Sequence, residues 1–69
     1  MNLEYLKEKR IENGFNQREF SELLEISHIA YRFIETGKRK PRFELMIKII
    51  NTLKLDANKL LNINHQISA

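Results

Sequence analysis

The sequence predicts a single all-α domain, and its length, its composition and the spacing of its apolar residues support this fold class. The chain has 69 residues with only two glycines and one proline, and its aliphatic residues recur at helical spacing. A chain of this length holds one modest hydrophobic core and no second domain. We therefore expect one domain over residues 1–61, followed by a C-terminal tail over residues 62–69 that lacks a clear pattern.

The first helix is predicted by a capping residue and a glycine stop. Asn2 is a good N-cap because its side chain can accept a hydrogen bond from the first helical turn. Leu3, Leu6 and Arg10 then follow at spacings of three and four residues, which places them on one helical face. Gly14 is expected to end this helix, since glycine adopts the left-handed conformation at little cost.

The second helix is predicted to begin with a capping box. Asn16 and Glu19 have the spacing at which each side chain bonds the backbone N–H of the other, so the helix should start directly after Asn16. Its inward positions are expected to be Phe20, Ser21 and Leu24. The small side chain of Ser21 suits a place where another helix approaches closely.

A short connection ending at Ser27 leads into a third helix, predicted over residues 27–35. Ser27 is a good N-cap, and Tyr31 and Ile34 continue an inward apolar stripe. Residues 38–42 are then expected to form an extended basic loop, because a residue that precedes a proline avoids the α region.

The strongest periodicity predicts a fourth helix of about three turns. Its inward stripe is predicted to comprise Phe43, Met46, Ile49, Ile50 and Leu53. Asp56 is a candidate N-cap for a short fifth helix that carries Leu60 and Leu61.

Positive charge is concentrated in one segment of the chain. The net charge is +3, but residues 26–42 carry five lysines and arginines against Glu35 alone, while the flanking segments are nearly neutral. This pattern is expected of a protein that binds a phosphate backbone. Short basic stretches are also common in ordinary solvated loops, so the charge by itself leaves both interpretations open.

Several short motifs occur in an order and at spacings that together point to one family. They span roughly residues 3–61 and comprise Leu6-Lys7, Arg10, Gly14-Phe15-Asn16-Gln17, Glu19-Phe20-Ser21, Leu24, Ile26-Ser27, Ile34-Glu35, Gly37-Lys38-Arg39-Lys40-Pro41 and Leu53-Lys54-Leu55. This ordered set resembles the lambda repressor and Cro-like helix-turn-helix family, also called the xenobiotic-response-element family. The resemblance implies a compact five-helix lambda repressor-like DNA-binding domain, with the helix-turn-helix formed by helices 2 and 3.

In that family the second motif helix is the recognition helix, so the resemblance implies that residues 27–35 lie in the major groove. The implied base contacts are His28, Ile29, Ala30, Arg32 and Phe33. The implied contacts to the phosphate backbone are Asn16, Gln17, Ser27, Thr36, Lys38, Arg39 and Lys40. Pro41-Arg42-Phe43 resembles the phage repressor variant in which the arginine reaches toward the minor groove, and Phe43 belongs to the same predicted contact.

The recognition helix departs from the usual family pattern, because Ile29 and Phe33 stand one turn apart where polar residues are commoner. One interpretation is that these apolar side chains contact thymine methyl groups while His28 or Arg32 bonds a purine. A second is that this face binds another protein. A third is that the helix is rotated, with Phe33 in the core and Tyr31 partly exposed.

Two further departures concern local stability. Glu25 stands at a turn position that is often glycine in the family, and a non-glycine residue at positive φ costs about 1 kcal/mol. Tyr31 replaces the usual aliphatic residue, so its hydroxyl needs a partner or a route to solvent. Arg10 and Glu35 match positions that form an ion pair in phage repressors. Their spacing alone does not distinguish a buried pair from two solvated charges.

Other function classes find little support in the sequence. The chain has no cysteine, its two histidines, His28 and His65, are far apart, and neither a nucleophile elbow nor a glycine-rich phosphate loop is present. We therefore expect no metal, no cofactor, no small-molecule ligand and no enzymatic activity. The apolar runs are too short to span a bilayer, so we expect no membrane contact and a cytoplasmic location.

The sequence-based hypothesis is a repressor or Cro-like regulator, from a phage, a mobile element or a bacterial chromosome, that binds double-stranded DNA as a homodimer on a palindrome. The apolar residues that are candidates for a symmetric contact are Ile47, Leu55, Leu60, Leu61, Ile63 and Ile67. The same residues can instead close the core. The alternative function is a protein-interaction module, such as an antitoxin or anti-repressor component, that uses an exposed face formed by Ile29 and Phe33.

Overall fold

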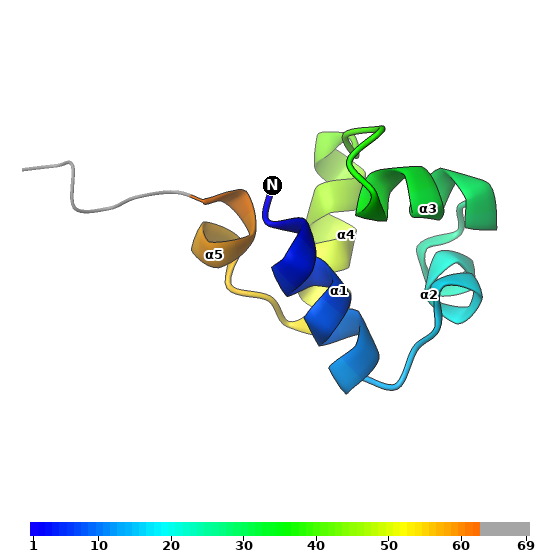
Figure 1. Cartoon of the computed structure of the whole chain (residues 1–69), viewed down its shortest axis with the longest axis horizontal. Coiled ribbons are helices and arrows are strands. Elements are labelled where there is room, and N and C mark those ends of the chain that lie inside the picture. The colour runs from blue at the N-terminus through cyan, green and yellow to red at the C-terminus, as the bar shows by residue number, and fades with distance from the viewer. Residues whose placement is uncertain (63–69) are drawn as a thin grey trace, which may run out of the picture.

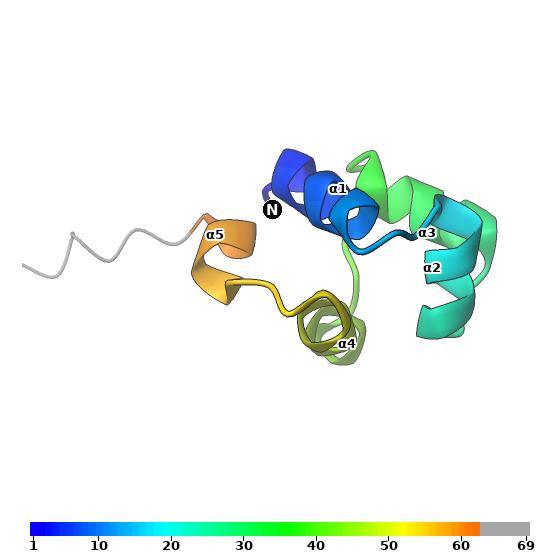
Figure 2. The same cartoon turned by 90° about the horizontal axis from the view of Figure 1, so that it is seen from below.

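The computed structural model describes residues 1–62, which form five helices and no strand. The helices are α1 (Leu3–Glu12), α2 (Gln17–Leu24), α3 (His28–Glu35), α4 (Phe43–Leu53) and α5 (Ala57–Leu61). Helices α2 and α3 lie at one end of the molecule and α5 lies at the other (Figure 1). Figure 2 shows α1 and α3 on one side and α4 on the other, with α2 across the end. The all-α prediction is confirmed.

Helix α1 begins and ends as its capping residues predict. The Asn2 side chain accepts a hydrogen bond from the Tyr5 N–H at 3.1 Å. Gly14 has a φ of +83°, and the N–H groups of Gly14 and Phe15 bond the carbonyls of Ile11 and Arg10. These two bonds form a Schellman motif, which satisfies carbonyls that the end of a helix would otherwise leave unpaired.

The capping box of α2 is present in full. The Asn16 side chain accepts from the Glu19 N–H at 2.7 Å, and the Glu19 carboxylate accepts from the Asn16 N–H at 2.9 Å. After α2, Glu25 has a φ of 60°, so the chain turns through a left-handed residue without glycine. Ser27 then caps α3 by accepting from the Ala30 N–H at 3.0 Å.

The core is assembled from all five helices and from Leu55. Its buried apolar members are Leu6, Phe20, Leu24, Tyr31, Ile34, Ile49, Leu53, Leu55 and Leu60. The rings of Phe20 and Tyr31 meet edge to face with centroids 5.2 Å apart, which joins the two helices of the motif. Ser21 is also buried, as its predicted place in the helix contact requires.

One prediction about apolar residues is wrong, and one alternative that the sequence left open is decided for two residues. Phe43 was predicted in the inward stripe of α4, but 79% of it is exposed, because it is the first residue of the helix and extends beyond the core. Leu55 and Leu60, for which the sequence allowed either a symmetric contact or a place in the core, are core residues with 8% and 0% exposure. Two of the other candidates, Ile47 and Leu61, are exposed, and Ile63 and Ile67 lie outside the described residues.

Most of the predicted tail, 63–69, also lies outside the described residues, as does His65. Asn62 is described, and it follows α5 with a φ of 58°. Within residues 1–62, no helix combines the length and the apolar character needed to cross a bilayer.

Candidate nucleic-acid interface

The outward face of α3 is open to solvent. Ile29 is 59% exposed and Arg32 is exposed, while His28 and Ala30 are half-buried near the start of the helix. The opposite face is inserted into the core, with Tyr31 and Ile34 at 0% and 1% exposure. The rotated-helix interpretation is therefore wrong.

A turn at the end of α3 brings the basic segment back over the last turn of that helix. The N–H of Gly37 bonds the Ile34 carbonyl at 3.2 Å, and the N–H of Lys38 bonds the Phe33 carbonyl at 2.8 Å. This is a second Schellman motif, and Gly37 adopts the required positive φ of +83°. The N–H of Arg39 also bonds the Phe33 carbonyl, at 3.1 Å. These hydrogen bonds fix the direction in which the basic segment leaves the helix.

Phe33 is half-buried, and two cationic side chains lie near its ring. The Lys38 Nζ lies 5.8 Å from the ring centroid and the Arg39 guanidinium carbon lies 5.9 Å from it. Both distances are within the range of cation–π attraction. The side chains of Lys38 and Arg39 therefore pack on a residue of the predicted recognition helix.

The positive charge beside α3 is uncompensated within the described chain. None of Lys38, Arg39, Lys40 and Arg42 forms an ion pair in residues 1–62, and all four are exposed. In Figure 1, α3, the segment after it and the beginning of α4 all reach the upper side of the molecule, while Figure 2 shows α4 on the opposite side from α3. The outward face of α3 is thus bordered by unpaired cations, which is the electrostatic arrangement that attracts phosphate groups.

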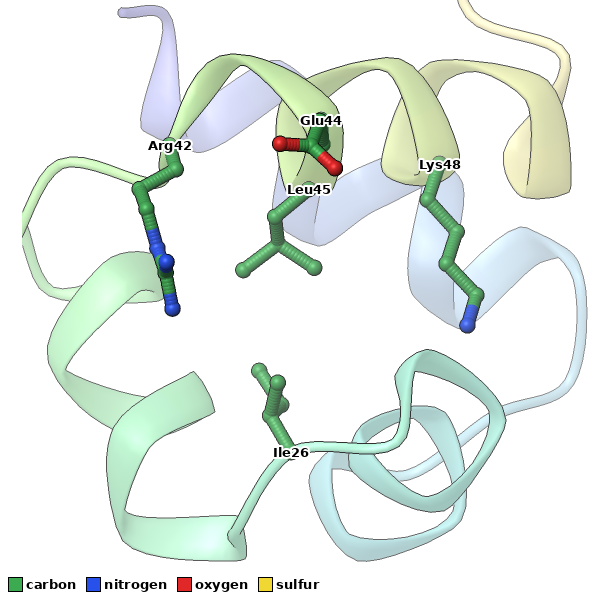
Figure 3. A pocket seen from close by; sticks show the side chains of 5 residues that line it. All are labelled: Ile26, Arg42, Glu44, Leu45 and Lys48. Atoms are coloured by element: carbon green, nitrogen blue, oxygen red, sulfur yellow. The ribbon is translucent and has the colours of Figure 1, made fainter.

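Arg42 is the N-cap residue that precedes α4, and it lines a shallow cavity of about 280 Å³ between α4 and the connection from α2 to α3. Ile26 and Leu45 face each other across this cavity, and Arg42 points from α4 toward α3 (Figure 3). Lys48 lines its other side and lies 3.7 Å from the Glu25 carboxylate. Phe43, next to Arg42, projects into solvent.

Residues at the beginning of α2 have divided roles. The Asn16 side chain is occupied by the capping box, and the Gln17 side chain points inward, where its Nε2 donates to Glu35 at 3.2 Å. The capping box also occupies the N–H groups of Asn16 and Glu19, so within residues 1–62 α2 leaves the N–H groups of Gln17 and Arg18 to attract an anion at this end. The contact of Gln17 with Glu35, 18 residues away, had no local signal in the sequence.

Arg10 and Glu35 are brought together beneath the motif. The Arg10 Nε and Nη2 donate to the two Glu35 carboxylate oxygens at 2.8 and 3.0 Å, and Nη1 donates to the Phe15 carbonyl at 2.6 Å. Arg10 and Glu35 are only 6% and 7% exposed. The pair joins the last turns of α1 and α3, so it helps to set the orientation of the recognition helix.

The electrostatics of this cluster favour the charged forms of both partners. Burial tends to raise the pKa of Glu35, but the hydrogen bonds from Arg10 and Gln17 outweigh it and lower the pKa below its ordinary value. The hydrogen bond to Glu35 raises the pKa of Arg10. Burial, together with the nearby Glu35 carboxylate, raises the pKa of Tyr31. The Tyr31 hydroxyl is buried without a hydrogen-bond partner among the described residues.

Comparison with known proteins agrees with this geometry. A family model described as helix-turn-helix matches residues 6–60. A protein of Bacillus subtilis (strain 168) named "Uncharacterized HTH-type transcriptional regulator YqaF" is 38% identical over 52 residues, which cover 75% of this chain and 68% of that protein. No solved structure shows a significant match. Since the family model covers most of the chain, the protein belongs to the lambda repressor and Cro-like helix-turn-helix family, as its ordered motifs predicted.

Proposed function

We propose that this protein is a sequence-specific transcriptional regulator that binds double-stranded DNA. In this proposal α3 enters the major groove and residues 38–42 lie along the phosphate backbone. The observation that carries the proposal is the exposed face of α3 bordered by four cations without ion-pair partners in residues 1–62. The naming of the similar Bacillus protein as a transcriptional regulator supports the same function.

Base readout is assigned to the exposed and half-exposed side chains of α3. Arg32 can donate two hydrogen bonds to a guanine edge, and His28 can donate to a purine from the first turn. Ile29, which is 59% exposed, suits contact with a thymine methyl group, and Ala30 permits close approach to the groove floor. Phe33 has cations packed on its ring, which favours a different role for it.

Phosphate contacts are assigned to both ends of the motif. At one end, the residues are Asn16, Gln17 and Ser27, which lie at the N-termini of α2 and α3, where the free N–H groups of the first helical turn attract an anion. At the other end, the residues are Thr36, Lys38, Arg39 and Lys40. Arg42 and the exposed Phe43 are assigned to the neighbouring minor groove, where an arginine senses groove width.

The regulator is proposed to act as a repressor or Cro-like homodimer on a palindromic site. A single motif covers few base pairs, and two copies related by a two-fold axis bind half-sites about one helical turn apart. Among the predicted contact residues, Ile47 and Leu61 are 40% and 38% exposed and are therefore available to a second copy.

Electrophoretic mobility shift at several salt concentrations tests the function. The probes are a duplex selected by the protein from a random pool and a scrambled duplex of equal length. We expect tight, selective binding that weakens steeply with salt. Lys40→Gln should weaken both duplexes alike, Arg32→Ala should reduce the preference for the selected duplex, and Lys59→Gln on the distant α5 should change neither. Failure of the wild type to prefer any duplex contradicts the proposal.

The exposure of Ile29 favours one alternative, a protein-interaction module in which this face binds a partner protein. Under this alternative, the purified protein binds no duplex and forms a stoichiometric complex with one partner protein. The substitution Ile29→Asp should abolish this complex. If the wild type binds one duplex selectively and Ile29→Asp weakens that binding, the protein-interaction alternative is excluded.

A further inference from the structure

We propose that Phe33 is a positioning residue that holds Lys38 and Arg39 against the DNA backbone, rather than a residue that reads bases. The inference rests on the proposed DNA-binding function and assigns one side chain of α3 a different part in it. The observations that carry it are the packing of both cations on the Phe33 ring and the hydrogen bonds of both residues to the Phe33 carbonyl.

The backbone turn after α3 explains why these three residues meet. In a Schellman motif the second residue after the cap lies over the third residue from the end of the helix, and an apolar contact between the two is frequent. Here those positions are Lys38 and Phe33, with Gly37 providing the positive φ between them. A lysine stem can supply the apolar part of this contact while its ammonium group stays in water.

Gly37 leaves this turn little freedom to change. The positive φ of Gly37 disfavours other residues, whereas a Cβ added there would lie 2.9 Å from the Leu3 Cδ1, the end of a flexible side chain that can move aside. The turn is held at the end of α3 by its own backbone hydrogen bonds, and it lies against the Leu3 side chain of α1. Lys38 and Arg39 therefore have a fixed backbone when they meet DNA, and only their side chains remain to be ordered. Contact with the Phe33 ring favours that ordering.

The charges around the ring support an electrostatic role. Lys38 and Arg39 repel each other, and they have no ion-pair partner in residues 1–62 that would draw them elsewhere. The negative face of an aromatic ring attracts a cation at these distances, whereas an aliphatic side chain of equal size does not. An aromatic residue at position 33 therefore lowers the free-energy cost of ordering the side chains of Lys38 and Arg39 before they meet phosphate groups.

The test compares Phe33→Leu, which keeps an apolar side chain without a ring, with Phe33→Tyr, which keeps the ring. Binding to the selected duplex and to the scrambled duplex is measured over a range of salt concentrations, with the thermal midpoint of each variant recorded. We expect Phe33→Leu to weaken both duplexes by a similar factor of about 3 to 10 and to leave their affinity ratio unchanged. Phe33→Tyr should bind as the wild type does. Ile29→Ala, a matched control one turn earlier, should instead change the ratio.

A second arm removes the cations instead of the ring. In a Lys38→Gln, Arg39→Gln background, Phe33→Leu should cause no further loss of affinity, because the groups it positions are absent. This arm remains decisive if Phe33→Leu also lowers the thermal midpoint, since a general structural defect would weaken binding in both backgrounds. A changed affinity ratio in Phe33→Leu, equal losses in the two backgrounds, or no loss at all would overturn the inference. Absence of duplex binding by the wild type would instead overturn the proposed function.

Discussion

Replacing Arg10 with alanine tests how far the buried ion pair supports the fold. The change removes two hydrogen bonds to Glu35 and one to the Phe15 carbonyl, and leaves the 7%-exposed carboxylate with Gln17 as its remaining hydrogen-bond donor. Breaking a buried pair in this way costs about 3 to 5 kcal/mol, because the surviving charge stays buried without compensation.

The structure also limits this cost, because Glu35 can bind a proton instead. Protonating a carboxyl group with an ordinary pKa of 4.5 costs about 3.4 kcal/mol near pH 7 and about 0.7 kcal/mol near pH 5. The destabilisation of Arg10→Ala should therefore be up to about 3 kcal/mol smaller near pH 5 than near pH 7. A loss of packing alone would not depend on pH in this way.

Urea denaturation followed by far-UV circular dichroism measures these free energies of unfolding at each pH. Lys9→Ala is the matched control, because Lys9 precedes Arg10 and pairs at the surface with Glu12 at 3.2 Å, and its loss should have little effect. The double variant Arg10→Met, Glu35→Leu should be more stable than Arg10→Ala, since no buried charge remains. A change below about 1 kcal/mol in Arg10→Ala near pH 7 would refute this reasoning.

Three further predictions concern the same cluster and the left-handed residues that end α2 and α4. Because its pKa is lowered in the folded state, Glu35 should stabilise the wild type fully above its ordinary pKa of 4.5, and this contribution should disappear as the pH falls through the lowered value. In acid titrations of stability Glu35→Gln should lack that component, and an unchanged profile would contradict the prediction. Tyr31→Phe removes a buried hydroxyl without a partner in residues 1–62, so the free energy of unfolding should rise by about 1 kcal/mol, whereas a decrease would indicate that the hydroxyl is hydrogen-bonded. Glu25→Gly relieves a left-handed residue with a φ of 60° and should raise the thermal midpoint, as should Lys54→Gly with a φ of 55°; a lowered midpoint in both would show that neither turn is strained.

Local chemistry made the ends of the helices predictable from the sequence. The caps Asn2, Asn16, Ser27 and Asp56 each accept the expected backbone hydrogen bonds, because capping depends on residues two or three positions apart. The inward positions of α2 were also predictable, since its apolar residues follow the helical period. Phe43 misled the same reasoning, because periodicity does not show where a helix leaves the core.

Contacts between distant segments were beyond the reach of sequence patterns. The Tyr5 hydroxyl accepts a hydrogen bond from the Asp56 N–H, 51 residues away, and this contact had no local signal. The Arg10 and Glu35 pair was suggested by family resemblance alone, since 25 residues separate them. Such contacts depend on tertiary packing, which spacing along the chain does not reveal.

The central claim is that the outward face of α3 and the cations beside it form the surface that binds DNA. An NMR titration of the isotope-labelled protein with the selected duplex tests this claim residue by residue. The account predicts the largest amide shift changes at the beginning of α2, along α3 and over residues 36–42, with little change in α5. Shift changes concentrated in α5 and α1, with α3 unaffected, would contradict it.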